Sequence, residues 1–312
     1  MSRGVGVRRS PTARRPVAVS AAVLASVVVL VVVTVVVAGG LPGPGGDGAG
    51  AAVVAGGGAT SSTPYYLALG DSLAAGVGSP DGKGYVADVY AREAKKIHGL
   101  ELENLSCSGA TTGSMIDGGG CSYTTGSQLG DAEAFLSAHP GQVAFVTVDI
   151  GANDVDGCTD GTTVNITCVT TGLDDIGTNL PTILSGLRSA GGSTPVLGMS
   201  YYDPFLAEWL LGSDGQNLAE ESVGLLDELN GTLTADYGAT ATARVEQAFK
   251  SQDFALHGSY DGTTVPVNVG RICAWTLMCS EENIHADDAG HAVIAKAFET
   301  VIRRALVAGR RG

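Results

Sequence analysis

The run VAFVTVDI at residues 143–150 is the most strand-like segment of the chain, because apolar, β-branched and aromatic residues dominate it. Its apolar residues are nearly continuous rather than alternating, which is typical of a strand buried on both faces. It ends at Gly151-Ala152-Asn153-Asp154, where a polar turn begins. The segment therefore predicts a central strand followed by a turn that carries polar side chains.

Candidate strands and helices alternate on both sides of this run. The other strand-like segments are residues 65–69, 102–105, 194–199 and 241–245. Helical spacing of apolar residues occurs at residues 86–97, 128–138, 176–187, 205–211, 218–229 and 288–307. This alternation predicts an α/β fold, a three-layer α/β/α sandwich with a five-stranded parallel sheet. In such sheets a ligand binds outside the carboxyl ends of the strands.

The first 63 residues differ in composition from the rest of the chain. Five arginines precede an apolar run at residues 17–38, which predicts a signal peptide or a retained N-terminal membrane anchor over residues 1–38. Residues 39–63 are mostly Gly, Ala, Ser, Thr and Pro, so we expect a disordered linker. Residues 64–308 then form the folded domain, a size that suits one large domain.

The six cysteines lie as three close pairs along the chain. An even number of cysteines behind an export signal indicates disulfides, and six permit 15 connectivities. We expect each cysteine to pair with its neighbour, because this pairing closes three short loops. A zinc site is disfavoured, since no pair has the two-to-four-residue spacing of a zinc ligand pair. The expected pairs are Cys107 with Cys121, Cys158 with Cys168, and Cys273 with Cys279.

Three turns that follow predicted strands carry residues suited to acyl transfer. Ser72, in Gly70-Asp71-Ser72-Leu73, is the candidate nucleophile, placed near a helix amino end, and its own backbone N–H can face a developing oxyanion. Gly109 lets a substrate approach a bare backbone N–H closely. Asn153 offers an amide that donates to an oxyanion without carrying charge. Each turn, taken alone, is also consistent with ordinary turn chemistry.

A fourth segment supplies a candidate general base. An alcohol is a weak nucleophile and needs a neutral imidazole within hydrogen-bond reach, and the other ring nitrogen of that imidazole needs a partner. His285 is the candidate base. Two partners remain open for its ring: Glu282, three residues earlier, or the backbone carbonyls of residues 280–282.

A competing interpretation takes Asp288 and His291 as the acid and the base. We favour His285, because the apolar stripe of residues 293–306 predicts a helix that begins near residue 288. His291 then lies in the first turn of that helix as a structural residue.

Together the four segments resemble the SGNH hydrolases, also called the GDSL esterase and lipase family, and especially its secreted actinobacterial lipases with three disulfides. The resemblance covers residues 65–306. Gly70-Asp71-Ser72-Leu73 matches the nucleophile block, Gly109 the glycine block, Gly151-Ala152-Asn153-Asp154 the Gly-x-Asn-Asp block, and His285 the base. The resemblance implies a flavodoxin-like fold, catalysis by Ser72 and His285, and an oxyanion hole made of the Ser72 N–H, the Gly109 N–H and the Asn153 amide.

The last block departs from the family pattern, which reads Asp-x-x-His-Pro-Asn-x-x-Gly-His. In this chain Glu282, Ala286 and Asp287 replace the Asp, the Pro and the Asn. These replacements leave the identity of the triad acid open.

The expected function is therefore that of a secreted serine hydrolase that cleaves small-molecule or lipid carboxylic esters. The alternatives are a carbohydrate-ester deacetylase and a tethered binding protein that has lost activity. No motif demands a metal or an organic cofactor. The net charge of −14 disfavours nucleic acid as a partner. We expect a monomer that contacts a membrane only through its N-terminal segment, if that segment is retained.

Overall fold

The computed structural model describes residues 63–159 and 163–309. The leader predicted for residues 1–38 and, except for Thr63, the linker predicted for residues 39–63 lie outside the described residues. Within the described ranges, no helix is both long and apolar enough to cross a membrane.

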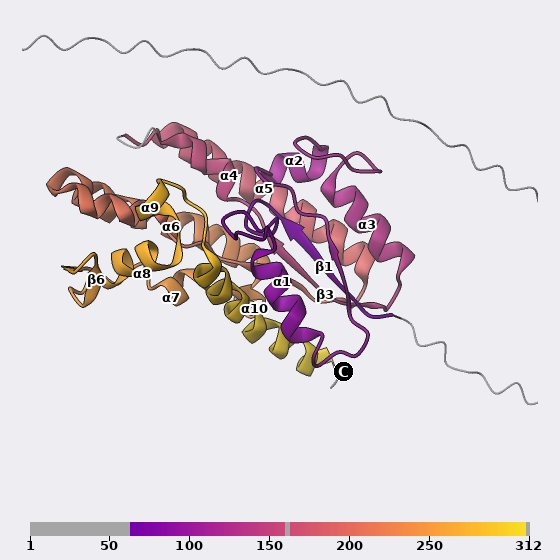
Figure 1. Cartoon of the computed structure of the whole chain (residues 1–312). Coiled ribbons are helices and arrows are strands. Elements are labelled where there is room, and N and C mark those ends of the chain that lie inside the picture. Colours follow the sequence, from indigo (N-terminus) through magenta and orange to yellow (C-terminus); the bar gives the residue numbers. More distant parts are fainter. Residues whose placement is uncertain (1–62, 160–162, 310–312) are drawn as a thin grey trace, which may run out of the picture. The chain divides into compact units, whose positions relative to one another are not determined.

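Five parallel strands form the central sheet in the order β2-β1-β3-β4-β5 (Figure 1). Their bounds are β1 Tyr65–Gly70, β2 Glu101–Asn104, β3 Val143–Asp149, β4 Val196–Met199 and β5 Thr242–Ala243. The first strand therefore lies between the second and the third, so the turns after β1, β2 and β3 all emerge at one edge of the sheet. The predicted five-stranded parallel sheet is confirmed.

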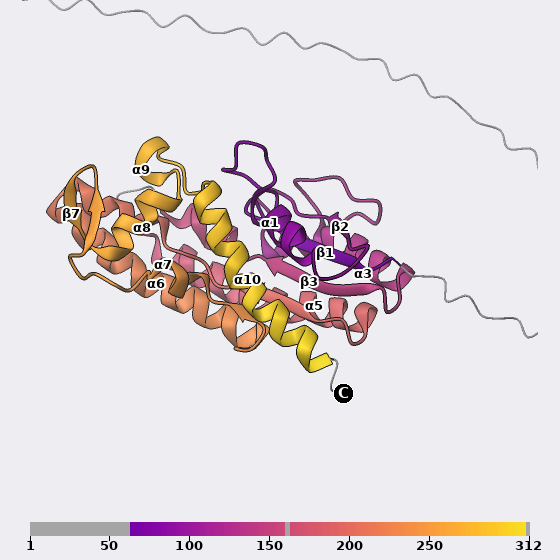
Figure 2. The same cartoon turned by 60° about the horizontal axis from the view of Figure 1, so that its bottom comes forward.

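Helices cover both faces of this sheet. On one face α1 (Gly84–Glu93) packs against α10 (Asp288–Gly309). On the other face α5 (Ile166–Gly191) packs against both α3 (Gln128–Ala138) and α6 (Ser213–Tyr237). Figure 2 shows α1 and α10 on the side of the sheet opposite α5. The three-layer arrangement is as predicted.

Several short elements were not predicted from the sequence. The predicted helix at residues 205–211 is the 3-10 helix η2 (Pro204–Leu211). The others are α2 Thr112–Asp117, α4 Ala152–Val155, the 3-10 helix η1 Asp156–Cys158, α7 Val245–Phe249, the antiparallel pair β6 Gly258–Tyr260 and β7 Thr263–Val265, α8 Val267–Trp275 and α9 Met278–Glu281.

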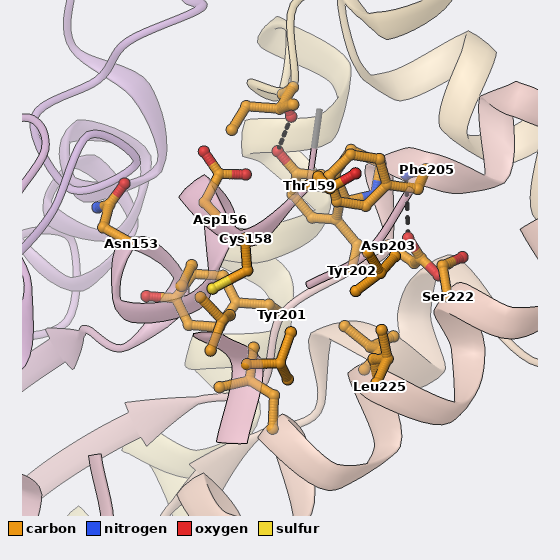
Figure 3. A pocket seen from close by; sticks show the side chains of 18 of the residues that line it. Asn153, Asp156, Cys158, Thr159, Tyr201, Tyr202, Asp203, Phe205, Ser222 and Leu225 are labelled. Carbon is orange, nitrogen blue, oxygen red and sulfur yellow. Dashed lines mark hydrogen bonds between the residues drawn. The ribbon is translucent and has the colours of Figure 1, made fainter. Parts of the chain in front are cut away.

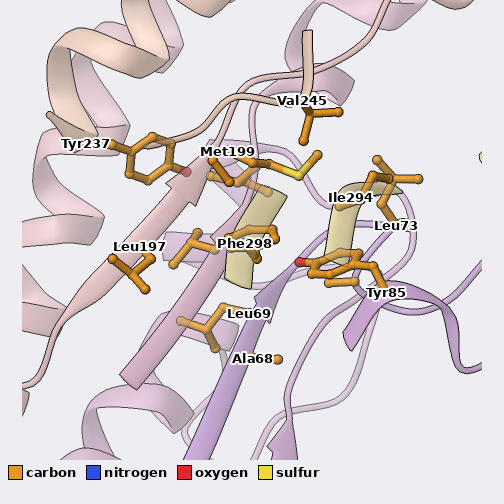
Figure 4. Close-up of a cluster of buried hydrophobic side chains, with 14 of the residues drawn as sticks. Ala68, Leu69, Leu73, Tyr85, Leu197, Met199, Tyr237, Val245, Ile294 and Phe298 are labelled. Carbon is orange, nitrogen blue, oxygen red and sulfur yellow. The ribbon is translucent and has the colours of Figure 1, made fainter. Parts of the chain in front are cut away.

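Buried aromatic rings fill the space around the sheet (Figure 4). Tyr85 on α1 stacks on Phe298 of α10, with ring centroids 5.1 Å apart. A Cβ at Gly198 in β4 would lie 2.3 Å from the ring of Tyr237, so the missing side chain lets this ring pack directly on the strand.

The three disulfides join the neighbouring cysteines, as predicted. They are Cys107–Cys121, Cys158–Cys168 and Cys273–Cys279, with sequence separations of 14, 10 and 6 residues.

Candidate active site

Ser72 lies in the turn that follows β1, and this turn requires glycine at its start. Gly70 has a φ of +145°, and a Cβ there would lie 1.5 Å from Oδ1 of Asp149. No side chain fits in that position without displacing the neighbouring strand. The side-chain amide of Gln128, at the start of α3, bonds to the Gly70 N–H at 2.7 Å and to the Gly70 carbonyl at 3.1 Å. The backbone that leads into Ser72 is therefore held from two sides.

Asp71 holds the same turn from within the core. Its buried carboxylate accepts hydrogen bonds from the Leu73 N–H at 2.9 Å and from the Tyr201 hydroxyl at 2.8 Å. Burial raises the pKa of Asp71, and these two hydrogen bonds oppose the rise. The helix amino end expected at Ser72 is not found, because the chain continues in turns until α1 begins at Gly84.

Gly109 is held between two residues that are bonded to the other turns. The Cys107 N–H donates to the Gly70 carbonyl at 3.0 Å, and the Ala110 carbonyl accepts from Nδ2 of Asn153 at 2.9 Å. Among the described residues, no hydrogen-bond partner is found for the backbone N–H of Gly109 or of Ser72. Both N–H groups therefore remain free to donate a hydrogen bond.

Asn153 and Asp154 lie in α4, directly after β3. Asn153 uses one amide hydrogen for the Ala110 carbonyl, which fixes its side chain and leaves the second hydrogen. The Asp154 carboxylate accepts from the Thr112 N–H at 2.9 Å and from the Thr112 hydroxyl at 2.6 Å. Since Thr112 follows Gly109 by three residues, Asp154 links the two loops that carry the candidate oxyanion donors.

His285 has its ring oriented by Asn283. Oδ1 of Asn283 accepts from the His285 backbone N–H at 3.1 Å and lies 2.6 Å from the ring Nδ1. An amide oxygen only accepts, so Nδ1 carries the hydrogen and Nε2 keeps the lone pair that a general base needs. Burial lowers the pKa of His285, and so does the neighbouring titratable ring of His291, which favours the neutral form of His285.

The prediction for the partner of the His285 ring is therefore wrong. Glu282 ends α9 in a left-handed conformation, with a φ of +53°, and is exposed. The ring nitrogen that Glu282 or a carbonyl of residues 280–282 was expected to bind is bonded to Asn283 instead. Asn283 was not predicted, because the family spacing points to a carboxylate three residues before the histidine.

The loops of Ser72 and His285 are bonded to each other through His291. Its Nδ1 accepts from the Tyr85 N–H at 3.1 Å, so Nε2 carries the hydrogen and donates to the Val77 carbonyl at 2.9 Å. A Cβ at Gly78 would lie 2.1 Å from the Ala286 carbonyl oxygen, so glycine allows the two loops to touch. The structural role expected for His291 matches these contacts.

One pocket is lined by Ser72, Asn153 and His285 together. Figure 3 shows a close view of this pocket, in which Asn153 is labelled. The cavity measures about 140 Å³, and Gly109 is not among its lining residues. Its polar lining includes Asp156, Tyr201 and Tyr202, which the sequence analysis did not connect with the site. Its apolar lining comes largely from α5, α6 and η2 and includes Val169, Leu173, Phe205, Leu218, Leu225, Leu226 and Leu229. The structure thus brings three of the four predicted segments to one apolar cavity.

A family model described as the GDSL-like lipase/acylhydrolase family matches residues 68–293. The chain belongs to this family. The matched range begins within β1, just before the turn that carries Ser72, and includes Gly109, Asn153 and His285. As a member of the GDSL-like family, the chain is expected to hydrolyse esters, and the resemblance found in the sequence is confirmed.

The fold is similar to that of solved structures, two of which match with a TM-score of 0.50 or more. A lipase from a goat rumen metagenome is 16% identical, with a TM-score of 0.53, and the match covers 77% of this chain and 97% of the lipase chain. A GDSL-like lipase from Parabacteroides merdae is 16% identical, with a TM-score of 0.50 and coverage of 77% and 96%. An extracellular lipase from Streptomyces rimosus is 21% identical, with a TM-score of 0.47 and coverage of 78% and 99%. No curated protein matches the chain.

Proposed function

We propose that the chain is an exported esterase or lipase that hydrolyses carboxylic esters of apolar acyl chains, with Ser72 as nucleophile and His285 as base. The observation that carries this proposal is the pocket, which is lined by both residues and by leucine, valine and phenylalanine side chains. Each methylene buried in such a cavity contributes about 0.8 kcal/mol. An acyl chain therefore suits this lining better than a hydrated sugar does.

The proposed reaction has two acyl-transfer steps. His285 Nε2 takes the Ser72 hydroxyl proton as Oγ bonds to the ester carbonyl carbon, and the carbonyl oxygen becomes an oxyanion. The backbone N–H groups of Ser72 and Gly109 and the free amide hydrogen of Asn153 are the proposed oxyanion donors. The C–O bond then breaks, and the proton passes from Nε2 to the leaving alcohol. Water attacks the acyl-enzyme, giving one proton to Nε2, and the proton returns to Ser72 Oγ as the acid leaves.

Export and a monomeric state are parts of the same proposal. The three disulfides persist best in an oxidising compartment, and the arginines before the apolar run at residues 17–38 are typical of a segment inserted in a membrane with the remainder outside. The proposed substrate is a small-molecule or lipid ester, and no nucleic-acid partner is proposed for this acidic chain.

The first experiment measures hydrolysis of p-nitrophenyl esters from acetyl to palmitoyl. We expect kcat/KM to rise about fourfold per added methylene until the cavity is filled, which corresponds to about 0.8 kcal/mol each. Leu225→Trp, which narrows the cavity, should move the optimum to shorter chains. A preference for acetyl esters, together with release of acetate from acetylated polysaccharide, would contradict this acyl preference and favour the deacetylase.

The second experiment tests the nucleophile. Ser72→Ala should abolish hydrolysis and labelling by a fluorophosphonate probe, because no other group in the mechanism forms the acyl-enzyme. Ser137→Ala, a matched control at an exposed serine near the end of α3, should keep both. Labelling that persists in the Ser72 variant would refute the assignment, and an unlabelled wild-type chain would favour the inactive binding protein.

A further inference from the structure

Asp156 supplies a carboxylate to the otherwise largely apolar pocket. It begins η1, directly after the short helix that carries Asn153, and it lines the pocket together with Ser72 and His285. Figure 3 shows its side chain among the lining residues. Asp156 is half-buried, so its charge is only partly screened by water.

Within residues 63–159 and 163–309, His285 is the one basic side chain that lines the pocket together with this carboxylate. The lining of the pocket contains no lysine and no arginine. No ion pair or hydrogen bond of the Asp156 side chain is found among the described residues. Burial raises the pKa of Asp156, and the nearby His285 opposes this rise. The ionisable base with which the carboxylate shares this pocket is therefore the His285 ring.

His285 in turn lacks a charged partner on its own loop. During the reaction the ring becomes an imidazolium, and a nearby negative charge stabilises it. Asn283 fixes the ring through a neutral amide oxygen, and Glu282 is exposed, where its charge acts on Glu208 rather than on the ring. Burial lowers the pKa of His285. Of the two titratable neighbours that act on the ring, His291 lowers this pKa as well, whereas Asp156 raises it.

We propose that Asp156 is the acidic positioning residue of this site, which stabilises the His285 imidazolium across the pocket while Asn283 sets the tautomer of the ring. Two tasks that a single carboxylate performs in a Ser-His-Asp triad are divided here between two loops. Asp156 lies in the loop of the Gly-x-Asn-Asp block, so one short segment carries both an oxyanion donor and the acid. This inference rests on the proposed function, because an imidazolium forms only if His285 is the base.

Asp156→Asn in the full chain tests the proposal, since the amide has nearly the same shape but no charge. We expect the pKa of the His285 ring, followed by NMR titration, to fall by about one unit, as expected for the loss of one nearby charge. The acid limb of kcat/KM against pH should move to lower pH by the same amount, because the ring stays neutral to lower pH. The plateau of kcat/KM should fall about tenfold, because the imidazolium loses its stabilisation.

Controls separate this role from a structural one. Asp156→Glu, which keeps the charge, should leave the His285 pKa and kcat/KM close to their wild-type values. Asp174→Asn, which removes an exposed carboxylate on α5, should change neither quantity. An unchanged His285 pKa and acid limb in the Asp156→Asn variant would overturn the proposal, as would a shift found in Glu282→Gln but not in Asp156→Asn. The NMR titration needs no substrate, so it tests the electrostatic effect of Asp156 on His285 even if the wild-type chain hydrolyses no ester. Loss of ester hydrolysis alone would count against the proposed function and not against this effect.

Discussion

Asp154→Ala should damage both the stability and the activity of this enzyme, because Asp154 joins two loops of the site. Its carboxylate accepts hydrogen bonds of 2.9 Å and 2.6 Å from Thr112. A hydrogen bond to a charged group contributes roughly 1.5–3 kcal/mol. Since Asp154 is only partly buried, the lower figure applies to each bond, and we expect the unfolding free energy to fall by about 3 kcal/mol.

The same change should lower kcat by roughly tenfold to a hundredfold. Loss of a whole oxyanion donor costs about a hundredfold to a thousandfold, and here the donors of Gly109 and Asn153 are displaced rather than removed. KM should change little, because the apolar wall of the pocket lies on other elements.

A double-mutant cycle with Thr112→Val measures the link directly. Urea unfolding of the wild type, the two single variants and the double variant should give a coupling energy of roughly 1–3 kcal/mol. Asp117→Ala removes an exposed carboxylate at the other end of α2 and should leave stability and kcat unchanged. Purely additive effects, or a full kcat in the Asp154 variant, would refute the reasoning.

Two further predictions concern stability. Burial raises the pKa of Asp203 from 3.8 to about 6, so between these pH values the folded protein holds a proton that the unfolded chain has lost, and stability falls as the pH rises. Asp203→Asn should remove about 3 kcal/mol of this pH dependence, measured by urea unfolding at pH 4 and pH 7. The same change in unfolding free energy between the two pH values in the wild type and in the variant would contradict this prediction. Replacing Cys107 and Cys121 together by Ser opens a loop with a sequence separation of 14 residues and should lower the unfolding free energy, measured by thermal unfolding, by about 3 kcal/mol. Because Gly109 lies inside that loop, kcat should fall too. An unchanged kcat would show that the disulfide does not hold the glycine in place.

The main elements of the fold could be predicted from the sequence because they repeat a strong pattern. β3 is apolar along nearly its whole length, and α10 carries an apolar stripe over many turns, so both segments are long enough to show their period. Most elements between residues 245 and 281 were missed because strands of three residues and helices of four or five are too short to show a period. The nine-residue helix α8 was missed as well. The 3-10 geometry of η2 was missed as well, because apolar residues three apart suit either type of helix.

The site was only partly predictable, for a different reason. Ser72, Asn153 and His285 follow strands or precede a helix, so local sequence indicates where they lie. The role of Asp156 could not be predicted in this way, because Asp156 enters the pocket lining from a short 3-10 helix. Whether it shares that lining with His285 depends on how two distant loops pack. Asn283 was missed because the family pattern places a carboxylate three residues before the histidine, whereas the ring is met by an amide two residues before it.

The separation between the catalytic turns and the walls of the cavity has a consequence for the divergence of such enzymes. The proposed reacting groups come from turns at strand ends and from the loop before α10, whereas Leu225, Leu226 and their neighbours come from helices that supply no reacting group. Replacement of wall residues can therefore retune which esters are accepted, in natural evolution or in protein engineering, while the machinery for bond cleavage is inherited unchanged.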